Sequence, residues 1–202
     1  MDSRIDEVIE FWFGTTPVPL PAIFRHWFTR DAAFDDEIRR KFGALHDEAA
    51  AGGLEDWRGT ARSELALLVV LDQWSRNLYR DQGRAFELDT RALGVASDLL
   101  LTDRARELNY HQRMVALLPY QHTEDRATQT EGVAAYTTLF DEAQRNNAPE
   151  ETLKTLAVGL DYAKQHAAII ERFGRFPHRN AALGRMTTPE EQAFLAQPGS
   201  RF

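Results

Sequence analysis

The spacing of apolar residues constrains the fold of this chain more than any other feature of the sequence. Nearly every long segment repeats apolar residues at i, i+3 and i+4, which is the period of an amphipathic helix. Segment 3–13 is typical, because Ile5, Val8, Ile9 and Trp12 fall on one helical face. No stretch sustains the period of two that a half-buried strand shows. The pattern predicts an all-α fold of about eight helices.

Capping residues predict where individual helices begin. Ser3 is the expected N-cap of the first helix, and Thr123 is expected to cap a later one with Glu124 and Asp125 in its first turn. Three prolines within residues 15–21 predict an extended linker after the first helix. The helices follow one another through short connections, which predicts antiparallel hairpins in one domain over residues 1–202. A helical bundle and a tetratricopeptide-like stack both fit this pattern.

The most apolar part of the chain lies in segment 61–74, whose centre is apolar on all sides. Such a helix is expected to be buried on every face. Its uninterrupted apolar run, Leu65 to Leu71, is far shorter than the roughly 20 residues that cross a bilayer, so no membrane partner is expected. Segment 84–101 is amphipathic again and is predicted to form another helix.

Composition narrows the class of protein. Hydrophobic residues make up 43% of the chain and charged residues 27%, the usual mix of a soluble globular protein. The absence of cysteine excludes disulfides, thiol catalysis, iron–sulfur clusters and cysteine-ligated zinc. The first residues show no signal peptide, so a cytoplasmic location is expected. The net charge of −7 argues against nucleic acid as a partner, because an acidic surface repels the phosphate backbone.

Polar residues cluster at three places where an apolar helix ends, and the first follows the buried segment. Asp72 would lie near the C-terminus of a buried helix, where an isolated carboxylate is costly. It therefore needs a partner, and Arg76 is one helical turn away. This pair either ends the helix as a structural ion pair or orients Arg76 and Asn77 toward a ligand.

The second cluster contains a histidine beside two carboxylates at a predicted helix start. His122 with Glu124 or Asp125 could form an acid–base pair or part of a metal site. The same carboxylates also suit the start of any helix, so a purely structural role is the alternative.

The third cluster is the richest and is basic in an acidic chain. Residues 166–185 contain four arginines and one glutamate, which gives this stretch a net charge of +3. Several guanidinium groups near histidine and asparagine suit carboxylate or phosphate recognition, whereas pairing to nearby acids is the structural alternative. The polar residues of this cluster are His166, Arg172, Arg175, His178, Arg179, Asn180 and Arg185.

The common catalytic motifs are absent from the sequence. It contains no P-loop, no Gly-x-Gly-x-x-Gly, no Gly-x-Ser-x-Gly and no His-Glu-x-x-His motif. No cofactor and no resident metal are therefore predicted.

Four short sequence motifs carry a resemblance to a known family. They are residues 11–14 (FWFG), 71–77 (LDQWSRN), 118–125 (LPYQHTED) and 172–180 (RFGRFPHRN). With these motifs in this order, the chain resembles the bacterial domain-of-unknown-function 924 family, from about residue 5 to residue 196. It differs in having Trp74-Ser75 where members usually have Phe-Pro, and Thr123 where they have Ser. The resemblance implies a helical, tetratricopeptide-like fold and no particular reaction.

The leading hypothesis is a binding module whose groove takes a small anionic ligand or an acidic peptide. It depends on the three clusters meeting in one hollow. One alternative is a hydrolase in which His122 with Glu124 or Asp125 acts as the base, with or without a metal held by His166 or His178. Another is a protein–protein scaffold. The expected ligand-binding residues are Asp72, Arg76, Asn77, His166, Arg172, Arg175, His178, Arg179, Asn180 and Arg185.

Overall fold

The chain folds into helices joined by short connections. The structure is a computed structural model that describes residues 2–14, 27 and 29–200. All regular elements within these residues are helical and none is a strand, which confirms the predicted all-α class. The linker expected at residues 15–21 lies outside the described residues.

The helices vary from one turn to more than six turns. Short 3₁₀ turns connect several of them: η1 (Glu55–Trp57), η3 (Gly83–Phe86), η4 (Arg104–Glu107) and η5 (Pro177–Arg179). One element, η2 (Val69–Trp74), is π-helical. The α-helices are α1 (Ser3–Phe13), α3 (Ala32–Ala50), α4 (Ala61–Leu68), α5 (Ser75–Leu78), α6 (Asp89–Leu101), α7 (Tyr110–Ala116), α8 (Leu118–His122), α9 (Arg126–Arg145), α10 (Glu150–Phe173) and α11 (Pro189–Leu195).

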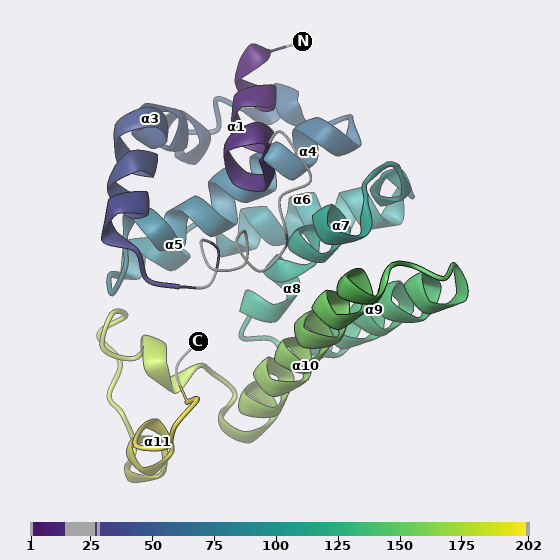
Figure 1. Cartoon of the computed structure of the whole chain (residues 1–202). Helices are drawn as coiled ribbons and strands as arrows, with labels where there is room; N and C mark the ends of the chain where they lie inside the picture. The colour runs from purple at the N-terminus through teal and green to yellow at the C-terminus, as the bar shows by residue number, and fades with distance from the viewer. Residues whose placement is uncertain (1, 15–26, 28, 201–202) are drawn as a thin grey trace.

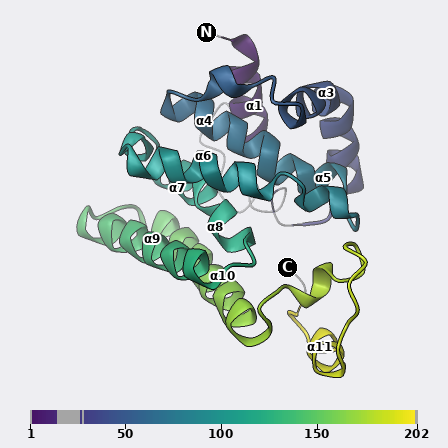
Figure 2. The same cartoon turned by 180° about the vertical axis from the view of Figure 1, so that it is seen from behind.

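The elements fall into three spatial groups (Figures 1 and 2). Helices α1, α3, α5, α6 and α7 pack around the central α4–η2 segment. Helices α9 and α10 form a long antiparallel hairpin, and the short α8 connects this hairpin to the first group. After α10 the chain turns back toward α5 through η5 and ends beyond α11. This return brings the C-terminal segment beside the corner between α6 and α8.

The predicted buried helix over residues 61–74 is present, with one local change. Every residue from 63 to 75 is buried, as an all-apolar helix centre requires. The helix widens into the π-helical turn η2 at Val69, and such turns frequently occur at functional sites. The predicted helix over 84–101 begins only at Asp89, because residues 83–86 form η3. A 3₁₀ turn and an α-helix have nearly the same period, so apolar spacing over one turn does not distinguish them.

Two predicted N-caps are wrong. Asp2, and not Ser3, caps α1 by accepting a hydrogen bond from the Arg4 amide. Asp125, and not Thr123, caps α9 through its carboxylate. Each correct cap lies one or two residues from the predicted one. Both residues of each pair carry a side-chain oxygen that can accept from a backbone amide, so N-cap preference alone does not choose between them.

Two apolar clusters hold the structure together. The large one joins residues of α1 through α10. The small one contains Ile169, Ile170 and Phe176, with Phe173 and Phe194 packed against it, and it anchors the C-terminal segment to the end of α10. No helix in the described part of the chain is long and apolar enough to cross a membrane.

Candidate functional site

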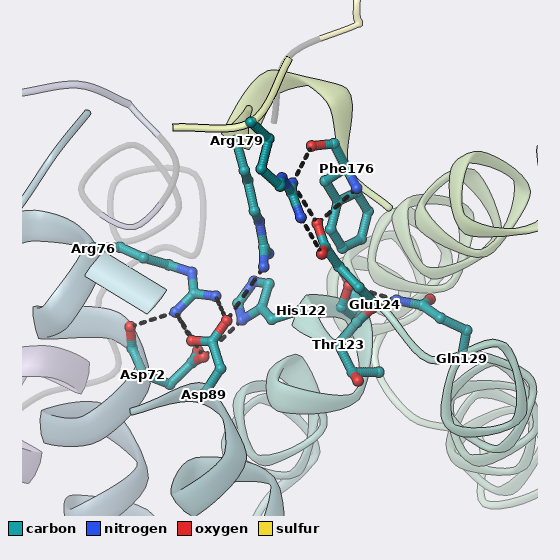
Figure 3. A network of polar contacts seen from close by, with 11 residues as sticks. Asp72, Arg76, Asp89, His122, Thr123, Glu124, Gln129, Phe176 and Arg179 are labelled. Atoms are coloured by element: carbon teal, nitrogen blue, oxygen red, sulfur yellow. Dashed lines mark hydrogen bonds and ion pairs between the residues drawn. The ribbon is translucent and has the colours of Figure 1, made fainter. Parts of the chain in front are cut away.

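An open cavity of about 310 Å³ lies where the C-terminal segment meets α6 and the end of α8. Its walls come from three stretches of the chain that are far apart in sequence. One is the η3–α6 stretch, which contributes Phe86 and Asp89. Another is the end of α8, with His122, and the last is the C-terminal segment, with Arg179 and Leu183. The structure therefore brings the second and third polar clusters to one hollow, and the first lies directly behind it (Figure 3).

Asp72, in the π-helical turn, connects the first cluster to the site by its contact with His122. Its carboxylate is 1% exposed and accepts hydrogen bonds from His122 Nδ1 at 2.7 Å and from Gln73 Nε2 at 2.5 Å. Arg76 Nη1 lies 3.0 Å from the same oxygen as His122, which confirms the predicted i, i+4 pair. Burial opposes ionisation, but the charge of Arg76 and the hydrogen bond from His122 hold the pKa of Asp72 well below its usual range. Asp72 is therefore a carboxylate that only accepts.

His122 is a neutral imidazole with a fixed tautomer. Burial lowers its pKa and the nearby guanidinium of Arg76 lowers it further, against the opposing effect of Asp72. Because Asp72 accepts, His122 Nδ1 must carry the proton, which leaves a lone pair on Nε2. Nε2 makes no hydrogen bond to any described residue, and the side chain lines the cavity. The arrangement offers a ligand one hydrogen-bond acceptor.

Helix α9 holds the end of α8 in place. Gln129 is 2% exposed, and its Nε2 donates to the carbonyl oxygens of Gln121 and Thr123, each at 2.8 Å. These two carbonyls flank His122 on both sides of the chain (Figure 3). These two hydrogen bonds satisfy carbonyl groups at the end of α8 and fix the backbone from which the imidazole projects.

A chain of alternating charges links Asp72 to the C-terminal segment. Arg76 donates both Nη atoms to Asp89, at 2.9 and 3.0 Å, while its Nη1 also contacts Asp72. Arg179 Nη1 reaches the same carboxylate of Asp89 at 3.3 Å. Two carboxylates thus balance two guanidinium groups, and one of those groups, Arg179, faces the cavity.

Arg179 is a buried cation with few partners. It is 6% exposed, and the 3.3 Å bond to Asp89 is the one hydrogen bond that its guanidinium makes within the described chain. Its Nε is buried without a partner. The rings of Phe86 and Phe176 each lie 4.5 Å from its guanidinium carbon. Burial, followed by the charge of Arg76, lowers its pKa to about 10, so it remains charged at neutral pH.

Glu124 fastens the C-terminal segment to this corner. Its carboxylate accepts two bonds from Arg185, at 2.6 and 2.9 Å, and one from the Phe176 amide at 2.8 Å. Arg185 also donates to the Phe176 carbonyl and to Asn180 Oδ1. These contacts lower the pKa of Glu124 despite its burial. Glu124 therefore positions the segment that carries Arg179.

The expected pairing of His122 with Glu124 or Asp125 does not form. Glu124 is engaged by Arg185, and Asp125 caps α9. The carboxylate that contacts the imidazole is Asp72, from the first cluster. This correction follows from tertiary structure, because Asp72 and His122 are 50 residues apart.

Of the ten expected ligand-binding residues, Arg179 alone belongs to the cavity lining. Among the others, Asn77 donates to Asp35 of α3 and Arg172 pairs with Glu190. Two more contact Glu191: Arg175 donates twice, at 2.6 and 2.9 Å, and Asn180 Nδ2 lies 3.2 Å away. The hydrogen bonds from Arg175 are the main reason that the pKa of Glu191 falls to about 2. These groups fix α11 and its surroundings.

Two further histidines extend the site behind His122. The ring of His166 lies 6.3 Å from that of His122 and 5.5 Å from that of Phe176. The ring of His178 also lies 5.5 Å from that of Phe176. Burial lowers the pKa of His166 to about 3 and that of His178 to about 4. Both are neutral at neutral pH. No three histidine, aspartate or glutamate side chains in the described chain are grouped as a metal site.

Sequence reasoning missed Phe86, Asp89 and Leu183. Asp89 begins α6, where an acidic residue is expected for the helix dipole alone, and a single phenylalanine on an amphipathic face carries no signal of a site. The i, i+3 spacing of Phe86 and Asp89 was the one available hint that both could face one side.

Comparisons with known proteins agree on the family. The family described as "Bacterial protein of unknown function (DUF924)" matches residues 8–199. A solved structure of a protein of unknown function from Agrobacterium tumefaciens is similar, with 32% identity and a TM-score of 0.75. The match covers 96% of this chain and 97% of that one. No curated protein matches the chain.

Proposed function

The chain belongs to this bacterial family of unknown function, whose description assigns no reaction, and from its geometry we propose that the cavity binds a small organic anion through Arg179. The protein would act as a cytoplasmic binding protein. The ligand would enter between α6 and the C-terminal segment and place its anionic group against the guanidinium.

The observation that carries this proposal is the incomplete pairing of Arg179. A guanidinium has five N–H donors, and a buried one is normally satisfied by carboxylates or carbonyls. Arg113, for comparison, donates to both oxygens of Glu142 at 2.6 and 2.8 Å. Arg179 shares one oxygen of Asp89 at 3.3 Å and yet is 6% exposed. An anion in the cavity would supply the missing acceptors.

The surroundings of Arg179 favour a small monoanion. The rings of Phe86 and Phe176 meet the guanidinium through cation–π contacts, which leave its unused N–H donors for a ligand. The cavity volume of about 310 Å³ suits a small molecule. Asp89 and Glu124 also line it, and their charges would repel a second anionic group on the same ligand.

Titration with butyrate and with inorganic phosphate, followed by NMR at pH 7.5, tests this function. We expect Arg179→Met to weaken butyrate binding at least tenfold while melting stays within a few degrees. Methionine keeps an apolar stem between the rings, and Asp89 stays paired because it retains its two hydrogen bonds from Arg76. The matched control is Arg106→Gln, which removes one charge from an exposed pair in η4 and should leave binding unchanged. Equal butyrate binding by wild type and Arg179→Met would refute the proposal.

A second candidate function is hydrolysis, and the Asp72–His122 pair is the observation that favours it. A neutral imidazole whose Nδ1–H is held by a carboxylate can accept a proton at Nε2 from water or a hydroxyl group. Arg179, which lines the same cavity, would then stabilise the negative charge that develops on the attacked group. A panel of ester and phosphoester substrates, compared between wild type and His122→Gln, tests it. Turnover that persists in His122→Gln would refute it.

A further inference from the structure

We infer that the ligand of this cavity carries a hydrogen-bond donor, a hydroxyl or an ammonium group, beside its single anionic group, and that this donor binds His122 Nε2. The inference rests on the proposed function, since it assumes that an anion occupies the Arg179 side of the cavity. It adds the chemical class of the ligand, namely a hydroxy or amino monocarboxylate or an analogue with the same two groups.

Two of the cavity groups with unused hydrogen-bonding capacity, Arg179 and His122, are of opposite kinds. Arg179 only donates, and His122, in its neutral tautomer, presents only an acceptor at Nε2. A simple anion would satisfy Arg179 and leave the imidazole lone pair without a donor from the ligand. A ligand with both groups satisfies both protein atoms at once.

The imidazole acceptor is fixed by its neighbours. Asp72 Oδ2 already accepts from Gln73 Nε2 and Arg76 Nη1 forms an ion pair with Asp72 Oδ1, so the side chain is held as a carboxylate with no proton to offer to Nδ1. The charged or titratable groups that face His122 are Asp72 and Arg76 from the η2–α5 segment, Asp89 from α6, and His166 from α10. Arg179 lies across the cavity on the C-terminal segment. The Arg76 guanidinium opposes protonation of the imidazole, and the carboxylate that touches the ring binds its other nitrogen.

The other lining residues indicate what kind of chain joins the two polar groups of the ligand. Leu93, Leu183 and the ring of Phe86 line the cavity and are apolar. They suit a short carbon chain. The acidic residues Glu87, Asp89 and Glu124 also line it, so they tolerate an ammonium or a hydroxyl group better than a second carboxylate.

Butyrate and its derivatives provide a matched set of probes. The set is butyrate, the three positional hydroxybutyrates and the three positional aminobutyrates, each titrated into wild-type protein at pH 7.5. We expect at least one substituted acid to bind five- to tenfold more tightly than butyrate, because it satisfies His122 as well as Arg179. Comparison of the hydroxy and amino series identifies which donor the site prefers.

Two variants separate the roles of the residues. In His122→Phe, which keeps an aromatic ring but has no acceptor, the substituted acid should bind no more tightly than butyrate, whatever the affinity of the variant for butyrate itself. In Arg179→Met, all the acids should bind weakly. Wild-type imidazole ¹⁵N shifts provide a readout that needs no variant, since the favoured acid should move the Nε2 signal and butyrate should not.

The outcomes distinguish this inference from the proposed function. If neither butyrate nor any derivative binds wild type, the proposed function is refuted and the inference with it. If butyrate binds and no derivative binds more tightly, the function stands and the inference is refuted. An advantage that persists in His122→Phe also refutes it, because the donor must then bind elsewhere.

Discussion

His122 Nδ1 lies 2.7 Å from Asp72 Oδ1, although the two residues are 50 positions apart in the chain. The contact joins the π-helical turn at the centre of the helical core to the end of α8 at the rim of the cavity. A buried carboxylate thereby determines which imidazole nitrogen faces a ligand. The properties of the rim consequently depend on a residue that lies outside the cavity lining.

Replacing the buried carboxylate should therefore change both stability and the imidazole tautomer. We expect Asp72→Asn to lower the free energy of unfolding by about 3 kcal/mol, because Arg76 loses one of its two buried anionic partners. The asparagine amide can donate to Nδ1, which would move the imidazole proton to Nε2 and remove the acceptor. Urea denaturation measures the first effect and imidazole ¹⁵N shifts the second.

Asp36→Asn is the matched control for that substitution. Asp36 pairs with Arg39 on the surface of α3, with 76% of its side chain exposed. Because exposed pairs contribute little, we expect a change within about 0.5 kcal/mol. If Asp72→Asn were as mild as this control and left the ¹⁵N shifts unchanged, the buried pair would not set the tautomer.

Stability should fall with acidification well before the carboxylates titrate. His166 and His178 have folded pKa values of about 3 and about 4, whereas an unfolded histidine titrates near 6.5. Below pH 6.5 the unfolded chain therefore binds protons that the folded chain does not, so the histidine contribution is complete above pH 6.5 and is lost as the pH falls. The loss is at most about 1.4 kcal/mol per pH unit for each histidine. Urea denaturation at pH 7, 6, 5 and 4 measures it.

His166→Gln isolates one histidine in this pH series. His166 Nδ1 contacts the Tyr162 carbonyl at 2.8 Å, and the glutamine amide can replace that donor. The variant should lose stability less steeply between pH 6.5 and 4 than wild type. Parallel curves for the two proteins would show that His166 is not kept neutral by the fold.

The attachment of the C-terminal segment provides a test of local order. Glu124→Gln removes the charge that pairs with Arg185 but keeps a carbonyl for the Phe176 amide. We expect the amides of residues 177–187 to exchange with solvent about fivefold faster, which corresponds to about 1 kcal/mol of lost local stability. Glu190→Gln, in the exposed pair with Arg172, is the control and should leave exchange unchanged. Equal exchange in both variants would mean that Glu124 does not hold the segment.

The sequence contained most of the information about the helices. Apolar spacing predicted the class, and the all-apolar run predicted the buried centre at residues 63–75. The i, i+4 spacing of Asp72 and Arg76 also predicted their ion pair, because residues four apart are neighbours on a helix. The π-helical turn was not predictable, since its spacing differs from that of an α-helix by less than apolar patterns resolve.

The site was only partly predictable, for a reason that lies in tertiary structure. His122 and Arg179 were selected by their residue types, and both line the cavity. Arg172 and Arg175 were selected by the same criterion, but acids of the last helix bind them. Which arginine pairs with an acid of α11 and which lines the cavity depends on how the C-terminal segment turns back. Residue types and spacing within one segment do not determine that course.

Close packing of α8 against α9 leads to a last prediction about the position of His122. A Cβ added at Gly132 would lie 2.8 Å from Tyr120 Cβ, and both neighbouring helices would have to separate. We expect Gly132→Ala to destabilise the fold by about 1–3 kcal/mol. Gly94 in α6 has open space around the same added atom, so Gly94→Ala should stabilise by about 0.5–1 kcal/mol.

The same pair of variants connects packing to the site. Tyr120 precedes His122 by two residues in α8, so a shift that relieves the clash would also move the imidazole away from Asp72. Gly132→Ala should therefore change the His122 ¹⁵N shifts and weaken binding of the favoured acid, whereas Gly94→Ala should leave both as in wild type. Thermal denaturation and NMR on the two variants measure this. If Gly132→Ala were destabilised with unchanged His122 shifts, α9 would support the fold without positioning the imidazole.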